Sequence, residues 1–266
     1  MKRTSQLFTT LLLIIFGVTY ADDTIPHQIT WKTQQADAKQ EIADHFLRAR
    51  KILQSLVKDH PAVMQQFDSF SKSVQQIYVA GEGLVSSDVH RIIDATIFAS
   101  AQHRKQTRKD TTQTPYVIHP IGVAESLVNL GHVRDPDVII GALLHDTVED
   151  TETTFEMLKS LFGSRVEGFV REVTDDKSLL QADRKRLQVE HASHKSAGAA
   201  QIKLADKLYN MTNVATNPPP DWDKARQDAY IEWGKQVTDH LPWVNAPLKN
   251  AIDTVVKNYQ TKKTTQ

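Results

Sequence analysis

The sequence predicts an all-α fold on three observations. Apolar residues recur at three- and four-residue spacing through most of the 266 residues, as expected for helices that are buried on one face. Residues that begin and end helices are frequent, whereas no segment keeps the strict alternation of a half-buried strand between hairpin turns. The composition, 40% hydrophobic and 24% charged, is ordinary for a globular protein with one main core.

The first 21 residues differ from the rest of the chain. Lys2 and Arg3 precede an apolar run from Leu11 to Val18, and small residues then lead to Ala21. This order is typical of a secretory signal peptide. The run is short compared with the roughly 20 apolar residues that cross a bilayer. We expect cleavage after Ala21, a periplasmic or secreted protein and no stable membrane insertion afterwards; an uncleaved N-terminal anchor is the alternative.

Residues 22–84 are predicted to form a helical hairpin in front of the main domain. Apolar residues at helical spacing cover 36–58 and 62–79, and Pro61 separates the two runs. Two glycines then interrupt the pattern, so we place a domain boundary here and take residues 85–266 as the main domain. The sequence does not identify a partner for the extension.

The main domain should contain a central buried helix among several amphipathic ones. Asp135 is expected to cap the central helix, because Pro136 suits its first turn and the following residues up to Leu144 are apolar on nearly every side. Two short helices are expected to begin with capping boxes, one formed by Thr153 and Glu156 and the other by Ser164 and Glu167. The other expected helices cover residues 86–105, 120–130, 183–192, 199–213, 222–240 and 245–260.

The charge balance argues against nucleic acid as a partner. Lys and Arg number 32, as do Asp and Glu, and loss of Lys2 and Arg3 with the signal peptide would lower the basic total to 30. Such a chain has no global positive field to attract phosphate backbones. Cysteine is absent, which excludes thiolate metal sites and cysteine nucleophiles. A metal would have to be held by His, Asp, Glu or Asn.

Four ionisable residues follow the central apolar helix: His145, Asp146, Glu149 and Asp150. If the helix continues, its turn of 100° per residue places them on one face. Carboxylates clustered beside a buried turn repel one another, and a bound cation would cancel that cost. Imidazole with carboxylate suits a divalent ion such as Mn²⁺. The alternative is a solvated acidic helix end without a metal.

Two other segments carry candidate ligands. His119 stands directly before Pro120 at the start of a predicted helix, and Asp206 belongs to a polar helical stripe. Taken alone, a histidine in such a place is more often a cap or core residue, and a polar stripe is usually a solvated face. Together with the adjacent His145 and Asp146, they supply two imidazoles and two carboxylates, a set that one divalent ion could bind.

Several strings of residues carry a resemblance to a known family. They are Arg108–Asp110, Thr114–Ala124, Ala142–Thr151, Val173–Lys177, Arg184–Glu190 and Lys203–Asn210. These strings resemble the HD superfamily and, within it, the hydrolase domain of the RelA/SpoT homologues, most closely the small single-domain alarmone hydrolases of the metazoan SpoT type. The similarity covers about residues 88–242 in the same order. It implies an HD-domain helical bundle and a metal-dependent phosphohydrolase.

The resemblance also implies roles for the matching residues. The implied ligands of one Mn²⁺ per chain are His119, His145, Asp146 and Asp206. The residues implied to orient and deprotonate the attacking water are Glu149 and Asp150. The implied substrate-binding residues are Asn210, Arg108, Lys109, Tyr116, Lys105, Lys177 and Arg186. Among these, Tyr116 could equally be a packing residue.

The reaction implied by the resemblance is hydrolysis of the 3′-pyrophosphate of ppGpp, guanosine 3′,5′-bis(diphosphate), to GDP and pyrophosphate. Three alternatives stay open: hydrolysis of another nucleotide that bears a ribose 2′- or 3′-phosphate, an inactive metal-bound binding module, and a purely structural helical protein. Glu149 and Asp150 argue against the binding module, because such a site needs no proton acceptor beside the metal. The chain departs from the family in its signal peptide and N-terminal extension, since these enzymes are normally intracellular.

Overall fold

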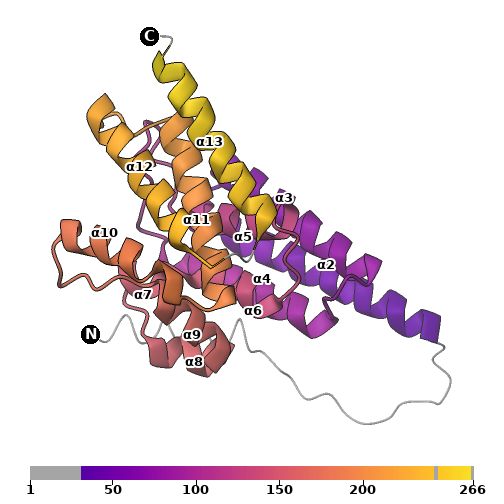
Figure 1. The fold of residues 1–266 in the computed structure, drawn as a ribbon. Helices are drawn as coiled ribbons and strands as arrows, with labels where there is room; N and C mark the ends of the chain where they lie inside the picture. Colours follow the sequence, from indigo (N-terminus) through magenta and orange to yellow (C-terminus); the bar gives the residue numbers. More distant parts are fainter. Residues whose placement is uncertain (1–30, 243–244, 265–266) are drawn as a thin grey trace. The chain divides into compact units, whose positions relative to one another are not determined.

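The computed structural model describes residues 31–242 and 245–264 (Figure 1). The predicted signal peptide, residues 1–21, lies outside this part. All regular elements of the described residues are helices, and an isolated bridge between Thr107 and Pro115 is their one extended pairing. The all-α prediction is therefore confirmed. None of the described helices is long and apolar enough to span a bilayer.

The chain divides into two compact units, Met1–Glu41 and Ile42–Gln266. The first unit is described only from the start of α2 (Trp31–Leu56). In the second unit, the remainder of α2 forms a hairpin with α3 (Pro61–Ala80), where Arg50 Nε and Nη2 donate to the carboxylate of Asp68 at 2.7 and 3.0 Å. The predicted domain boundary after residue 84 stays a prediction.

The predicted helices of the main domain are observed, with differences at their ends. They are α4 (Ser86–Gln102), α5 (Ile118–Asn129), α6 (Pro136–Leu144), α7 (Thr147–Asp150), α8 (Phe155–Phe162), α9 (Ser164–Val173), α10 (Gln181–Glu190), the 3₁₀ helix η1 (Ala192–His194), α11 (Ala197–Thr216), α12 (Lys224–His240) and α13 (Ala246–Thr264). The two expected capping boxes are wrong. Thr153 is buried and bonded to Thr151, so Thr154 caps α8 instead, and Ser164 makes no side-chain cap at α9.

The central helix α6 is buried as predicted, and the side chain of Asp135 caps it by accepting from the Asp137 amide at 3.1 Å. The helix ends at Leu144, however, and a turn at His145 and Asp146 separates it from α7. The prediction of one continuous helical face is therefore wrong. Side chains take the carbonyls that a continuing helix would use: His145 Nδ1 donates to Ala142 O and Thr147 Oγ1 to Leu144 O, both at 2.7 Å.

Helix α11 packs against α5, α6, α9, α12 and α13, and Figure 1 shows α11, α12 and α13 side by side. Two glycines allow α5 and α6 to approach α11 closely. A Cβ on Gly122 would lie 2.1 Å from the ring of Tyr209, and a Cβ on Gly141 would lie 2.8 Å from Ile202 Cδ1. Close packing of these three helices brings together side chains that are distant in the sequence.

Candidate metal centre and active site

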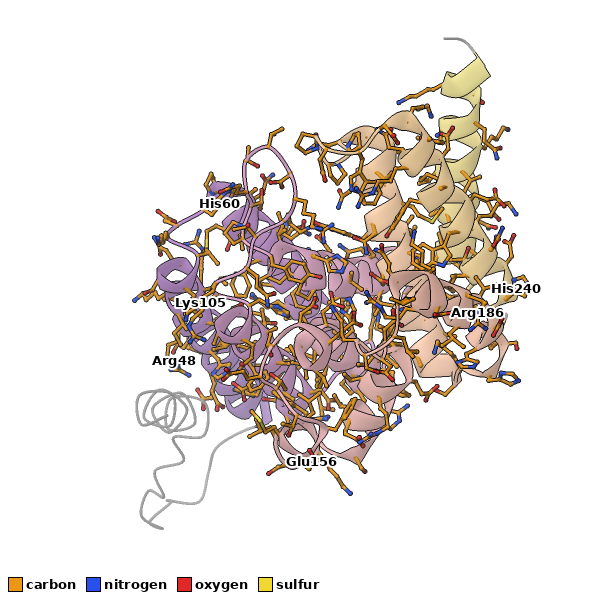
Figure 2. All side chains as sticks on the ribbon, turned by 90° about the vertical axis from the view of Figure 1, so that its left-hand side faces the viewer. Arg48, His60, Lys105, Glu156, Arg186 and His240 are labelled. Atoms are coloured by element: carbon orange, nitrogen blue, oxygen red, sulfur yellow. The ribbon has the colours of Figure 1, made fainter. Side chains whose placement is uncertain are left out.

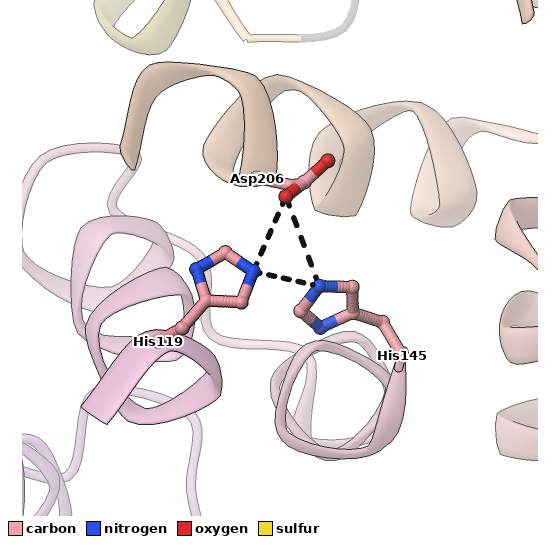
Figure 3. Close-up of side chains that lie close together, drawn as sticks. All are labelled: His119, His145 and Asp206. Atoms are coloured by element: carbon pink, nitrogen blue, oxygen red, sulfur yellow. Dashed lines mark hydrogen bonds and ion pairs between the residues drawn. The ribbon is translucent and has the colours of Figure 1, made fainter. Parts of the chain in front are cut away.

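Two imidazoles and a carboxylate meet where α5, the end of α6 and α11 come together (Figure 3). His119 Nε2 lies 3.2 Å from His145 Nε2 and 3.4 Å from Asp206 Oδ1. His145 Nε2 lies 3.8 Å from the same Asp206 oxygen. All three residues are buried, and their ligand atoms lie within 4.8 Å of one another.

Asp146 completes the group. Its Oδ2 lies 3.1 Å from His145 Nε2 and 3.4 Å from His119 Nε2. Ligand atoms about 2.1 Å from a divalent ion are about 3.0 to 3.4 Å apart in octahedral or tetrahedral geometry. Four of the five separations, from 3.1 to 3.4 Å, lie in this range, and the fifth, from His145 Nε2 to Asp206 Oδ1, is slightly longer at 3.8 Å. We call His119, His145, Asp146 and Asp206 the metal cluster; the structure thus brings together all four residues that the sequence singled out.

The hydrogen bonding of His145 prepares its Nε2 to bind a metal. The carbonyl oxygen of Ala142 can only accept, so the proton of the neutral imidazole stays on Nδ1 and the lone pair stays on Nε2. Burial lowers the pKa of His145, but the negative charges of Asp146 and Asp206 outweigh this effect and raise the pKa to about 9. A cation is therefore strongly favoured at this position, whether a proton or a metal.

Asp206 is held in its charged form by neighbours on its own helix. Burial acts to raise its pKa, yet the ammonium of Lys207, 3.1 Å from Oδ2, helps to keep that pKa well below the usual range. Asn210 Nδ2 donates to Asp206 Oδ1 at 2.7 Å, while Asn210 Oδ1 accepts from Arg108 Nη2 at 2.9 Å. Asn210, which the resemblance assigns to substrate, thus links the cation Arg108 to the metal cluster.

The acidic pair Glu149 and Asp150 lies on α7, shortly after His145 and Asp146 in the sequence. Lys177 Nζ lies 3.2 Å from Glu149 Oε1 and 2.7 Å from Asp150 Oδ1, and the Asp175 amide donates to Glu149 Oε2 at 3.1 Å. Burial raises the pKa of Glu149, and the nearby charge of Asp146 acts in the same direction. A carboxylate with a raised pKa is a better proton acceptor.

A cavity of about 290 Å³ shares two residues with the surroundings of the metal cluster. One is Asn210, and the other is Tyr116, whose hydroxyl donates to Asp146 Oδ2 at 2.6 Å. The residues that bring ring faces and positive charge to its lining are Arg108, Lys109, Tyr116, Trp222 and Tyr230. Aromatic rings with a few placed polar and cationic groups suit a nucleotide. A larger groove of about 620 Å³, between α2 and α3, contains none of these residues.

Two of the implied substrate-binding residues, Lys105 and Arg186, are absent from the cavity lining. Arg186 is half-exposed on α10, where it pairs with Glu190 at 2.8 Å and with Asp183 at 3.4 Å. Lys105 has no interaction with the metal cluster or the cavity among the described residues, and Figure 2 shows Lys105 and Arg186 on opposite sides of the view. Their role in phosphate binding stays a prediction.

Sequence reasoning missed several residues near the acidic pair and in the cavity. Arg184 Nη1 lies 3.8 Å from Glu149 Oε1, although the neighbouring Arg186 was expected to serve the substrate. Lys203 is buried one turn before Asp206 on the same helix, and its spacing of three residues from Asp206 could have indicated this position. Trp222 and Tyr230 line the cavity from beyond a proline-rich turn, and no local signal in the sequence marks them.

Comparison with known proteins agrees with this arrangement. Residues 95–231, about half of the chain, match the HD domain family. The chain belongs to the HD domain family and is a metal-dependent hydrolase.

Individual members of this family are similar to the chain over nearly their whole length. The guanosine-3′,5′-bis(diphosphate) 3′-pyrophosphohydrolase MESH1 of Xenopus tropicalis is 46% identical over 169 residues, which are 64% of this chain and 94% of that protein. Its Homo sapiens counterpart is 45% identical over 173 residues, 65% of this chain and 97% of that protein. A solved structure, described as a metazoan ortholog of SpoT that hydrolyzes ppGpp, has a TM-score of 0.62 and 45% identity, and covers 63% of this chain and 94% of its own. The resemblance seen in the sequence is confirmed.

Proposed function

We propose that this protein hydrolyses the 3′-pyrophosphate of ppGpp to GDP and pyrophosphate, with Mn²⁺ as its metal. The observation that carries the proposal is the convergence of the metal cluster beside the acidic pair Glu149 and Asp150. The Xenopus and human relatives, whose names state this activity, match the chain over nearly their whole length.

The donor set supports a divalent ion of borderline hardness. Two imidazole nitrogens and two carboxylates face one another, and the chain has no cysteine, so the site is suited to Mn²⁺ more than to metals that prefer sulfur. When bound, such an ion lowers the pKa of a water ligand and polarises a phosphoryl oxygen. The protein's part is to hold the four ligands in place and to provide a proton acceptor.

We assign the acceptance of the proton from the attacking water to Glu149. Burial favours its protonated form, and the Asp175 amide orients its carboxylate by donating to Oε2. The water oxygen adds to the phosphorus attached to the ribose 3′-oxygen, and the bond between that phosphorus and the 3′-oxygen breaks. One proton leaves the water and one is taken up by the 3′-oxygen, so the products are GDP and pyrophosphate.

The aromatic cavity would hold the nucleoside part of the substrate. Tyr116 and Asn210, which line the cavity, bond directly to Asp146 and Asp206, so a nucleoside held against the aromatic lining would have its ribose phosphates close to the metal cluster. Arg108 contacts Asn210, with its guanidinium carbon 5.5 Å from the centre of the Tyr116 ring. In the proposed binding mode the positive charge of Arg108 would pair with phosphate oxygens of the substrate.

The test is pyrophosphate release from ppGpp by the chain from Asp22 onward, reloaded with Mn²⁺ and assayed beside His145→Ala and Glu149→Gln. We expect wild type to release GDP and pyrophosphate in equal amounts. His145→Ala should lose both metal and activity, while Glu149→Gln should keep the metal and lose turnover by at least about 100-fold. The matched controls are His240→Ala, which changes an exposed histidine at the end of α12, and Glu167→Gln, which changes a carboxylate paired with Arg171 on α9.

Two results would overturn the proposal. Wild type that cleaves another nucleotide with a ribose 2′- or 3′-phosphate, but releases no pyrophosphate from ppGpp, would indicate a different substrate. Wild type that holds one divalent ion per chain and cleaves neither kind of nucleotide would indicate a binding module. Metal content, measured by elemental analysis of each variant, separates loss of the ion from loss of catalysis.

A further inference from the structure

Three cations outside the aromatic cavity surround Glu149. Lys177 belongs to the loop between α9 and α10, Arg184 to α10 and Lys203 to α11. Lys177 Nζ lies 3.2 Å and Arg184 Nη1 lies 3.8 Å from the same oxygen of Glu149, and Lys203 interacts electrostatically with this carboxylate. None of the three lines the cavity that we assign to the nucleoside.

Lys203 is a buried cation with weak partners. It is 6% exposed, and its one hydrogen bond within the described part of the chain is long, 3.4 Å to the Val173 carbonyl. Burial lowers its pKa, and the positive charge of Lys207 adds to this effect. A buried ammonium that lacks a close anion costs free energy, so an anionic group that reached it would be strongly attracted.

Arg184 also has unused hydrogen-bonding capacity. Its Nε is buried without a hydrogen-bond partner among the described residues, and its Nη1 is too far from Glu149 for a hydrogen bond. A guanidinium can donate two parallel hydrogen bonds to a phosphate group. The arrangement of Arg184 thus points to a ligand with several oxygens.

The loop that carries Lys177 is held beside these residues. Gln188 of α10 donates to Asp175 Oδ2 at 2.6 Å, and the Asp175 amide donates to Glu149. Lys177 itself is about half exposed, so its ammonium can turn from the carboxylates towards a bound anion without unpacking the core.

We infer that Lys203, Arg184 and Lys177 form a binding position for the outer phosphate of a ribose-linked diphosphate, and therefore for the product pyrophosphate. The inference rests on the proposed function, because the inner phosphate must lie at the metal cluster for the outer one to reach these cations. In this inference, Lys203, Arg184 and Lys177 select a ribose that carries a diphosphate over one that carries a single phosphate.

The experiment measures binding of inorganic pyrophosphate, orthophosphate and GDP to the metal-loaded protein by calorimetry. Lys203→Met keeps the side-chain volume and removes the charge, and Arg184→Gln changes a more accessible side chain. We expect each to weaken pyrophosphate binding by at least about tenfold, as for loss of a charged hydrogen bond, with GDP binding unchanged. Arg171→Gln removes an equal charge from an exposed ion pair on α9 and should leave pyrophosphate binding unchanged.

Several results would overturn the inference: wild type that does not bind pyrophosphate more tightly than orthophosphate, variants that bind it as wild type does, or equal losses for pyrophosphate and GDP. Metal content and melting temperature identify a variant that has not folded. The binding data are independent of turnover. Pyrophosphate binding through Lys203 without ppGpp hydrolysis would therefore contradict the proposed function alone, and hydrolysis without such binding would contradict this inference alone.

Discussion

The Nε2 atoms of His119 and His145 lie 3.2 Å apart in the interior of the protein. Nδ1 of His145 is already a donor to Ala142, so a neutral His145 directs a lone pair towards His119. The carboxylates of Asp146 and Asp206 approach the same point. A divalent cation satisfies both rings and both carboxylates at once.

Metal binding should release about one proton per chain below about pH 9. Burial lowers the pKa of His145, but Asp146 and Asp206 raise it to about 9, and the ion can bind Nε2 only after that proton leaves. Apparent metal affinity should therefore rise by up to about tenfold per pH unit from about pH 7 to about pH 9 and then level off. Calorimetry in buffers of different ionisation enthalpy measures the released proton; an affinity independent of pH over this range would contradict the prediction.

In the metal-free protein, the contribution of His145 to folding stability should fall as the pH rises, whereas metal affinity should increase. Because the folded-state pKa of His145 is raised from 6.5 to about 9, its stabilising contribution is fully present below pH 6.5 and is lost as the pH rises through about 9. Denaturant unfolding of metal-free wild type and His145→Gln should reveal this contribution as a difference that shrinks with rising pH. A difference that grows with pH would contradict it.

Tyr116→Phe should weaken metal binding by about tenfold while the fold is kept. The substitution removes the hydroxyl that donates to Asp146 Oδ2 at 2.6 Å and leaves the ring in place. Metal titration measures the effect. Tyr259→Phe is the control, because its hydroxyl pairs with Lys224 and Asp228 and not with the metal cluster. Equal metal affinities for Tyr116→Phe and wild type would show that the hydroxyl does not orient Asp146.

Arg108→Gln should raise KM for the nucleotide by at least about tenfold, and more than Arg186→Gln does. Arg108 lines the cavity and bonds Asn210, whereas Arg186 is paired with Glu190 on the exposed side of α10. Steady-state kinetics of the two variants compare the sites directly. A larger effect at Arg186 would support the role implied by the resemblance and contradict the placement seen in the structure.

Gly122→Ala should destabilise the protein by about 1 to 3 kcal/mol through overpacking and should weaken metal binding. The added methyl would meet the ring of Tyr209 at 2.1 Å and push α5, with His119, away from α11. Gly168→Ala is the matched control, since a Cβ there has no neighbour within 4 Å and alanine favours a helix. Denaturant unfolding and metal titration should separate the two; equal stabilities would show that α5 does not depend on this close approach.

Export of the protein can be tested on its N-terminus. If residues 1–21 are a cleaved signal peptide, the chain recovered from the periplasm or the medium should begin at Asp22. N-terminal sequencing measures this directly. A chain that stays in the cytoplasm with an intact N-terminus, or in the membrane with residues 1–21 attached, would contradict the prediction.

Local patterns predicted the helices well because capping, proline position and apolar spacing act over a few residues. Asp135 and Pro136, for example, begin α6 as expected. The local patterns failed where side chains compete for backbone groups. The hydrogen bonds of His145 and Thr147 to carbonyls of α6 end that helix early. At the start of α8, Thr154 is the cap in place of Thr153. Such competition depends on burial, which spacing alone does not show.

The sequence by itself determined the ligand types, the adjacency of His145 and Asp146, and the acidic pair that follows them, because these are properties of neighbouring residues. Only the tertiary structure decided that His119 and Asp206 meet them, since close helix packing at Gly122 and Gly141 sets the distances. It also decided that Arg184, and not Arg186, faces Glu149. The direction of a long charged side chain depends on the helix it packs against.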